Sequence, residues 1–181
     1  MSIVAIISSP EKGGNTDTIV NTIVDEARAK GKETEVFYIN PMSNRKGCQG
    51  CGGCKKKGSC VVKDDITPVL DAIRKADGVI LSSPVYFGEA CGQYRLVEDR
   101  FFSFINGNFT PNIAPGKKVA VVTAAGSEGA DVLADKIAAT MKNYFKCDIV
   151  GKIAFVSRSD KNAAKNDAAV LAEAKALADK F

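Results

Sequence analysis

The chain has 181 residues, of which 45% are hydrophobic and 25% are charged, with a formal net charge of +4 at pH 7. This length suits about one domain with a sizeable core, and no apolar run reaches the ~18 residues that a membrane-spanning helix needs. Histidine is absent, which excludes histidine-based acid–base, nucleophilic and zinc mechanisms, so we expect a cofactor to carry any chemistry.

The first predicted elements are a strand, a helix and a second strand. Ile3–Ile7 is a continuous apolar run, which is typical of a strand covered on both faces. Asn15 or Thr16 can cap the following helix, and Gly31 is predicted to end it. The second strand is predicted over Glu35–Ile39. The apolar residues that share one face of the helix are Ile19, Val20, Ile23, Val24 and Ala27.

A segment rich in glycine, cysteine and lysine follows at 40–63. Thr67 and Pro68 then indicate a helix cap and a first helical residue, with the helix running to about Ala76. Val79–Ser82 is the third predicted strand. The apolar and aromatic side of the next helix holds Leu96, Val97, Arg100, Phe101 and Phe104.

The last third of the chain continues the alternation. Lys118–Thr123 is the fourth predicted strand, a helix is expected over roughly 129–145, and the fifth strand is expected near Asp148–Phe155. An alanine-rich helix then runs to Phe181, and its inner face holds Leu171, Ala174 and Leu177.

Strands that alternate with helices predict an α/β fold. We expect a doubly wound, five-stranded parallel sheet of flavodoxin-like type, with strand order 2-1-3-4-5. Residues 1–181 are predicted to form a single domain, with a Cys-rich insertion at about 45–62.

Three loops should meet beyond the carboxyl ends of the strands, where such sheets bind ligands. The first, at 8–16, leads into a helix N-terminus, and its hydroxyls, glycines and free N–H groups suit a phosphate. It contains neither a Walker lysine pattern nor G-x-G-x-x-G, which disfavours NTP hydrolysis and a dinucleotide site. A plain turn that caps a helix would have the same composition.

The second loop, at 82–91, contains Tyr86 and Phe87, which could form a wall against a planar ring or belong to a small satellite core. The third, at 123–129, is small and glycine-containing, which suits either close approach to a ring or an ordinary turn. Together the three loops favour a flavin.

The segments SSPEKGGNT and DDITPVLDAIRKADGVILSSPVYFG, followed by a helix ending in Glu98-Asp99-Arg100, resemble the NADPH-dependent FMN reductase group of flavodoxin-like proteins. The resemblance covers most of the first 130 residues. It implies FMN with its phosphate held by Ser9, Lys12, Gly14, Asn15 and Thr16. The ring and ribityl chain would then contact Pro84, Val85, Tyr86, Phe87, Gly88, Ala125 and Gly126.

Three positions depart from this family's pattern. Glu11 stands where members commonly have arginine, so Lys12 must supply any cation near the phosphate. Cys91 replaces a common serine and could touch the ring, and Arg95 replaces a common lysine.

Four of the six cysteines form a C-x2-C-x2-C-x5-C pattern: Cys48, Cys51, Cys54 and Cys60. Ferredoxin-type clusters begin with the same two-residue gaps, and the intervening glycines let the backbone bend around a bulky group. Zinc is the main rival, although two C-x2-C pairs for zinc are usually farther apart. The cysteines could also be non-ligating residues of a plain flavin reductase.

Disulfides are not expected. The N-terminus shows no signal-peptide pattern, which favours a cytoplasmic protein whose thiols stay reduced. Cys147 lies outside the pattern and is expected to be a small buried apolar residue.

This cysteine spacing inside a flavin domain resembles the iron–sulfur flavoproteins of anaerobic archaea and bacteria. The resemblance implies one FMN and one [4Fe-4S] cluster per subunit, and a homodimer or higher homo-oligomer. It also implies electron transfer from ferredoxin to oxygen, peroxide or a quinone-like acceptor, with the catalytic chemistry carried by the two cofactors.

Six lysines and arginines and no acidic residue lie between Val36 and Lys63. They could dock an acidic donor such as ferredoxin or form an ordinary solvated face. No nucleic-acid partner is expected, because the segment lacks interleaved aromatic residues and a recognisable binding module.

Two other functions fit the same residues. One is an NAD(P)H-dependent FMN or quinone reductase in which the cysteines are incidental. The other is a redox or metal sensor that uses the cluster as a switch.

Overall fold

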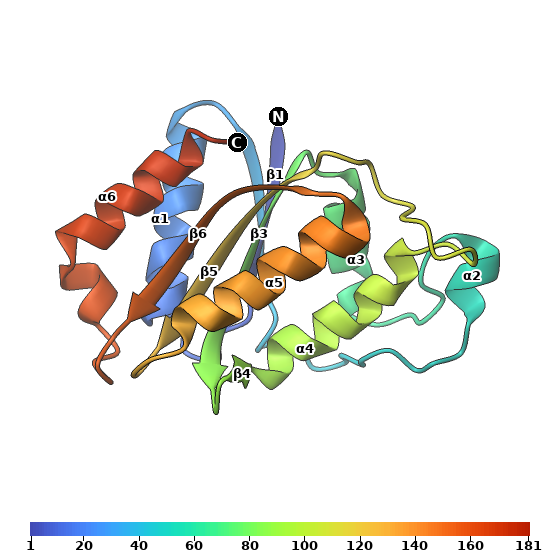
Figure 1. Cartoon of the computed structure of the whole chain (residues 1–181), viewed down its shortest axis with the longest axis horizontal. Coiled ribbons are helices and arrows are strands. Elements are labelled where there is room, and N and C mark those ends of the chain that lie inside the picture. The colour runs from blue at the N-terminus through green and yellow to red at the C-terminus, as the bar shows by residue number, and fades with distance from the viewer.

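The computed structural model describes residues 1–181, and its centre is a twisted sheet with helices on both faces (Figure 1). The parallel strands lie in the order β2-β1-β3-β5-β6. Their bounds are β1 (Ser2–Ile7), β2 (Glu33–Tyr38), β3 (Gly78–Tyr86), β5 (Lys118–Ala125) and β6 (Asp148–Val156). The predicted doubly wound parallel sheet is confirmed.

The predicted strand count of five and the order 2-1-3-4-5 are wrong, because a sixth strand follows β3. This strand, β4 (Glu89–Ala90), pairs antiparallel with the end of β3. The two residues between the paired strands, Phe87 and Gly88, both have positive φ. Two such residues make the tightest hairpin turn and match the right-handed twist of the strands.

The helices pack in two layers against the sheet. They are α1 (Asn15–Ala29), α2 (Gly53–Lys57), α3 (Ile66–Lys75), α4 (Gly92–Glu98), α5 (Ala130–Phe145) and α6 (Ala168–Ala178), with 3₁₀ segments η1 (Asp99–Phe104) and η2 (Ala163–Asn166). α1 and α6 contribute to one hydrophobic core, and α3, α4, η1 and α5 contribute to the other. None of these helices has the combined length and apolar character that a bilayer crossing requires.

The unbroken apolar run at the N-terminus follows from these two layers. Along β1, Val4 and Ile6 belong to one core, whereas Ile3, Ala5 and Ile7 belong to the other. Burying each large aliphatic side chain stabilises the fold by about 1.5–3 kcal/mol. A strand covered on both faces has no position at which a polar side chain is favoured.

The helix starts differ from the prediction in α1 and α3. The N-cap of α1 is Gly14, because the Asn15 side chain bonds the distant Asp160 carbonyl and Ala164 N–H. α3 starts at Ile66, and the Thr67 hydroxyl donates to the Val62 carbonyl. The predicted capping side chains therefore make tertiary contacts instead.

The neighbouring strands β1 and β3 lead to opposite sides of the sheet. The chain continues from β1 to β2 on one side, and from β3 to β5 on the other. The loops that leave these strands therefore diverge and leave a crevice at the carboxyl edge.

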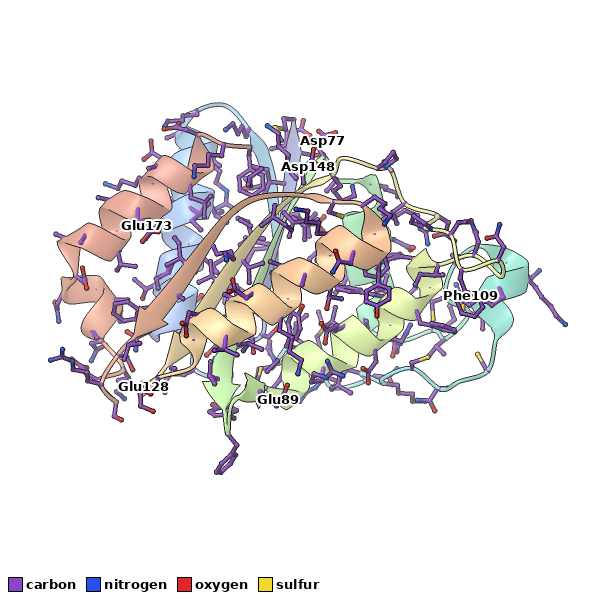
Figure 2. The ribbon with its side chains drawn as sticks, in the orientation of Figure 1. Asp77, Glu89, Phe109, Glu128, Asp148 and Glu173 are labelled. Atoms are coloured by element: carbon purple, nitrogen blue, oxygen red, sulfur yellow. The ribbon has the colours of Figure 1, made fainter.

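The Cys-rich segment lies away from this edge. It connects β2 to α3 and contains the short helix α2, which lies against the chain after η1. Lys55 Nζ donates to the Phe102 and Ile105 carbonyls, and the Asn112 amide donates to the Gly58 carbonyl. Figure 2 marks Phe109 in this region, next to α2.

Candidate functional site

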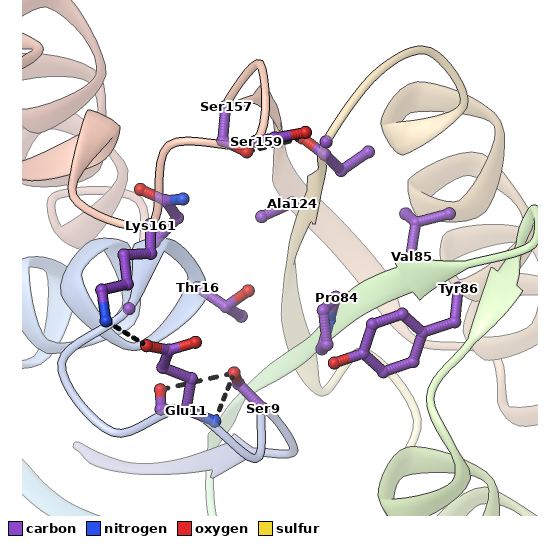
Figure 3. A pocket seen from close by; sticks show the side chains of 14 residues that line it. Ser9, Glu11, Thr16, Pro84, Val85, Tyr86, Ala124, Ser157, Ser159 and Lys161 are labelled. Carbon is purple, nitrogen blue, oxygen red and sulfur yellow. Dashed lines mark hydrogen bonds and ion pairs between the residues drawn. The ribbon is translucent and has the colours of Figure 1, made fainter.

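A cavity of about 720 Å³, including its open mouth, lies at the carboxyl ends of β1, β3, β5 and β6. Figure 3 shows side chains from four segments of the chain around it. It brings together most of the predicted flavin residues: Ser9, Gly14, Asn15, Thr16, Pro84, Val85, Tyr86, Ala125 and Gly126. Lys12, Phe87 and Gly88 are not among the residues that line it.

One end of the cavity is polar and lies at the start of α1. Ser9 Oγ donates to the Glu11 carbonyl and accepts from the Glu11 N–H, which shapes the loop. The buried Thr16 lies in the first turn of α1, whose N–H groups have no partner within the helix. This end therefore presents hydroxyls and helix-terminal donors, the groups that bind a phosphate.

The loop after β6 also lines the cavity, which the sequence analysis missed. The additional lining residues are Glu11, Ala124, Ser157, Ser159 and Lys161. Asn15 fixes this loop against α1 through bonds of 2.7 Å to the Asp160 carbonyl and 2.8 Å from the Ala164 N–H. The sequence did contain a signal for this loop: a polar run follows directly after the fifth predicted strand, which ends at the same edge of the sheet.

The two lysines near the polar end are placed differently. Lys12 Nζ lies over the Tyr38 ring, 5.6 Å from its centroid, outside the cavity lining. Lys161 lines the cavity, and its Nζ pairs with Glu11 Oε1 at 3.4 Å (Figure 3). Lys161 is therefore the cation that the fold presents to the cavity.

The opposite end is walled by Pro84, Val85 and the ring of Tyr86 (Figure 3). Burial, and then electrostatic repulsion from nearby groups that include Glu11, raise the pKa of Tyr86 above its ordinary value. Its hydroxyl therefore remains a hydrogen-bond donor at neutral pH. Phe87 is fully exposed at the hairpin turn, outside this wall.

Cys91 does not reach the cavity. It is 1% exposed, its thiol donates to the Ser8 carbonyl at 3.3 Å, and its N–H donates to Ser83 Oγ at 3.0 Å. The expectation that Cys91 could touch a bound ring is wrong. Because Ser8 directly follows β1 and Ser83 lies within the neighbouring strand β3, Cys91 links the carboxyl ends of these two strands.

The four cysteines of the spaced pattern line a second cavity, of about 310 Å³ with its open part, together with Phe102 and Arg100. All four are free thiols: Cys54 is buried, Cys60 is half-buried, and Cys48 and Cys51 are exposed. No three histidine, cysteine, aspartate or glutamate side chains lie close enough together to hold a metal ion. The thiols therefore surround a common space without converging on one point.

The basic residues of this segment fall into two groups. The Arg45 guanidinium donates to carbonyls of its own segment, and Lys55 donates to those of Phe102 and Ile105 while lying 3.5 Å from the Phe102 ring centroid. The others are exposed and form no ion pair: Lys46, Lys56, Lys57 and Lys63.

A helical rod leads from beneath the first cavity to the second. α4 begins directly after Cys91, and its continuation η1 carries Phe102 at the cysteine cavity. At 1.5 Å per α-helical and 2.0 Å per 3₁₀ residue, Cys91 and Phe102 lie roughly 20 Å apart along this rod.

Comparisons with known proteins identify a family and several relatives. The model of the family described as NADPH-dependent FMN reductase matches residues 1–161. An iron–sulfur flavoprotein of Methanocaldococcus jannaschii is 36% identical over 100 residues, which cover 55% of this chain and 51% of that protein. One of Methanosarcina thermophila is 33% identical over 109 residues, 60% of this chain and 56% of that protein. The chain thus spans about half the length of these curated relatives.

Solved structures share the fold at low sequence identity. The azoreductase AzrA superposes with a TM-score of 0.74 at 15% identity, over 100% of both chains. An NAD(P)H:quinone oxidoreductase from Methanothermobacter marburgensis superposes with a TM-score of 0.66 at 15% identity, over 98% of this chain and 95% of that one.

Proposed function

The chain belongs to the NADPH-dependent FMN reductase family, and from that premise we propose that it is an iron–sulfur flavoprotein that transfers electrons. As a family member it is a flavin-dependent oxidoreductase. In the proposed arrangement the cavity at the carboxyl edge of the sheet holds FMN. A [4Fe-4S] cluster is held by Cys48, Cys51, Cys54 and Cys60.

The carboxyl-edge cavity suits FMN in the order of its groups. Ser9, Thr16 and Lys161 offer hydroxyls and a cation to the phosphate, and Tyr86 offers an aromatic face to the ring. Gly126 has room for no side chain without a close contact, since a Cβ there would lie 3.2 Å from Ser159 Oγ.

The observation that supports the cluster is that four free thiols line one cavity. A single tetrahedral zinc ion bonds each sulfur at about 2.3 Å, so its four sulfurs must stand within about 4 Å of one another. A cubane instead offers each thiolate a separate iron, so its ligands stand farther apart. No three side chains are placed to hold one ion, so the assignment of a cluster rests on the spacing of the four cysteines, on the cavity that they share and on the iron–sulfur flavoproteins to which the chain is similar.

When bound, FMN exchanges one or two electrons and the cluster exchanges one, which lets a one-electron donor drive a two-electron reduction. We propose ferredoxin or a similar acidic carrier as the donor, and oxygen, peroxide or a quinone-like molecule as the acceptor. Lys46, Lys56, Lys57 and Lys63 would attract such a carrier.

A homodimer or higher homo-oligomer is part of the same proposal. Within one subunit, Cys91 beneath the flavin cavity and Phe102 at the cysteine cavity lie roughly 20 Å apart along the rod of α4 and η1. A second subunit can bring its own flavin site closer to the cluster.

Anaerobic purification, followed by a visible spectrum and counts of iron, sulfide and zinc, tests the proposal. Flavin bands with broad absorption near ~400 nm and about four irons per chain are expected. Cys48→Ser, Cys51→Ser and Cys54→Ser should each lose iron and keep FMN, whereas Cys147→Ser should keep both. Full iron content in all three of the first variants would contradict the ligand assignment.

An NAD(P)H-dependent FMN or quinone reductase is the second candidate, because no three side chains are placed to hold a metal ion. The same preparation separates the two functions. Flavin without iron, together with rapid NADPH oxidation, would favour this second candidate.

The docking of ferredoxin is tested by stopped-flow mixing at increasing ionic strength. Lys56→Glu/Lys57→Glu should slow reduction at low salt, whereas the same charge change at Lys142 and Lys175, on the exposed faces of α5 and α6, should not. Equal rates for the two double variants would contradict the proposal that the exposed lysines of the Cys-rich segment dock the donor.

A further inference from the structure

We infer that Arg100 is a positioning residue for the cysteine site. Its side chain closes the Cys-rich segment and donates a charged hydrogen bond to the sulfur of Cys60. The inference rests on the proposed cluster. It concerns a residue of the helical rod that lies 40 positions away from the cysteine that it contacts.

Arg100 is a buried cation with an extensive set of acceptors. The residue is 1% exposed, and an unpaired charge at such a depth would be strongly destabilising. Its Nη1 donates to the Lys46 carbonyl and to Asp64 Oδ2, each at 2.9 Å, and its Nη2 donates to the Val62 carbonyl at 3.3 Å. Its Nε donates to Cys60 Sγ at 3.1 Å.

These contacts hold the two ends of the cysteine segment together. Lys46 precedes the first cysteine of the pattern, and Val62 follows the last. Asp64 strengthens the closure, because it also accepts from the Lys46 N–H at 2.9 Å. Burial alone would raise the pKa of Asp64, but the bonds from Arg100 and Lys46 hold it below the ordinary value. One ion pair thus fixes both ends of the segment.

The bond to Cys60 adds an electrostatic role. A cluster held by four thiolates is an anion, and hydrogen bonds to its sulfurs raise its reduction potential. A guanidinium donates such a bond with a full positive charge behind it. The same bond reaches Cys60 from outside the Cys-rich segment and orients its sulfur.

Arg74 provides an internal control, because it anchors the same region without touching sulfur. It donates to the Asn112 carbonyl at 2.6 Å, to the Gly58 carbonyl at 3.1 Å and to the Ser103 carbonyl at 3.2 Å. If Arg100 served the fold alone, replacing either arginine should have similar consequences for the cluster.

The test compares three reconstituted proteins with wild type: Arg100→Gln/Asp64→Asn, Arg100→Lys and Arg74→Gln. The double variant removes the buried pair together, because removing one partner alone leaves an uncompensated charge. FMN content reports the folding of each protein. Iron per chain, the rate of iron loss to a chelator and the midpoint potential of the cluster report the site.

We expect the double variant to bind FMN as wild type does, to lose iron several-fold faster and to have a more negative cluster potential. Arg100→Lys keeps the charge and loses the forked geometry, so its rate of iron loss and its cluster potential should lie between those of wild type and of the double variant. Arg74→Gln should leave the potential unchanged.

An unchanged potential in both Arg100 variants, or an equal shift in Arg74→Gln, would overturn the assignment while leaving the proposed function intact. If the double variant does not fold, the cluster potential of Arg100→Lys, compared with that of wild type, tests the assignment instead. A wild-type protein that takes up no iron on reconstitution would instead contradict the proposed function, and the inference with it.

Discussion

At the scale of single residues, the charge at the polar end of the flavin cavity is set by two loops, each of which contributes one charged side chain. Glu11 lines this end of the cavity, and Lys161 from the loop after β6 pairs with it. Lys12, the neighbouring residue in sequence, lies over Tyr38 instead. The charge that faces a phosphate is therefore decided by which side chain points into the cavity.

This placement predicts the order of FMN affinities. Lys161→Gln should weaken FMN binding by about 1 kcal/mol, roughly fivefold, as for an exposed ion pair. Glu11→Gln should strengthen binding, because it removes a competing anion, and Lys12→Gln should change it little. Fluorescence titration of the apoprotein measures all three. Riboflavin, which lacks the phosphate, should bind the variants equally. Greater loss in Lys12→Gln than in Lys161→Gln would contradict the assignment.

Cys147 predicts a pH dependence of thiol reactivity. Burial raises the pKa of this thiol to about 11, although the Lys117 charge opposes the shift. Only the thiolate attacks iodoacetamide, so at pH 8 roughly one molecule in a thousand is reactive at this position. In iron-free native protein, Cys48 and Cys51 should be labelled first. Labelling of Cys147, followed by peptide mass spectrometry, should rise about tenfold per pH unit, and a plateau near pH 9 would refute this.

At the scale of elements, the cysteine segment depends on the close approach of α2 to the chain that follows it. Gly53 opens α2, and a Cβ placed on it would lie 2.6 Å from Val61 Cγ2. Real side chains do not approach so closely, so the absence of a side chain at Gly53 allows Cys54 and Cys60 to border the same cavity.

Gly53→Ala is therefore expected to lower the iron content after reconstitution and to leave FMN binding unchanged. Gly92→Ala is a matched control, because Gly92 also opens a helix and a Cβ there meets nothing within 4 Å. Adding Val61→Ala to Gly53→Ala should restore iron by removing the contact. Iron and flavin counts on the same samples measure the effect. Normal iron in Gly53→Ala would show that the segment adjusts without the glycine.

At the scale of the whole molecule, the C-terminal residue closes one core over the centre of the sheet. The ring of Phe181 is nearly buried and packs on Gly78, at the start of β3. A Cβ on Gly78 would lie 2.5 Å from Phe181 Cδ1. Lys118 holds the last turn in place by donating to the Lys180 carbonyl at 2.8 Å. The first and last parts of the chain are thus packed into one core.

A double-mutant cycle tests this contact. Gly78→Ala should reduce the free energy of unfolding by about 1–3 kcal/mol through overpacking, and Phe181→Ala should reduce it by about 3 kcal/mol. In the Phe181→Ala background, Gly78→Ala should cost less than about 1 kcal/mol, because the clash is gone. Urea unfolding provides the values. Strict additivity would show that the two residues do not restrict each other.

The sequence by itself determined the features that depend on neighbouring residues. The apolar runs located the parallel strands, and the composition of the loop after β1 and the spacing of the cysteines predicted a phosphate site and a metal-binding segment, because periodicity, turn composition and short-range spacing are local properties. The boundaries failed where a side chain was recruited by a distant partner, as with Asn15 and Thr67.

The tertiary structure decided which distant segments meet. It brought Lys161 to the cavity, turned Phe87 away from it, buried Cys91 beneath it and placed Arg100 against Cys60. Each of these outcomes depends on strand register and on the angle at which a helix crosses the sheet. These are set by packing of the whole core, and no window of adjacent residues contains them.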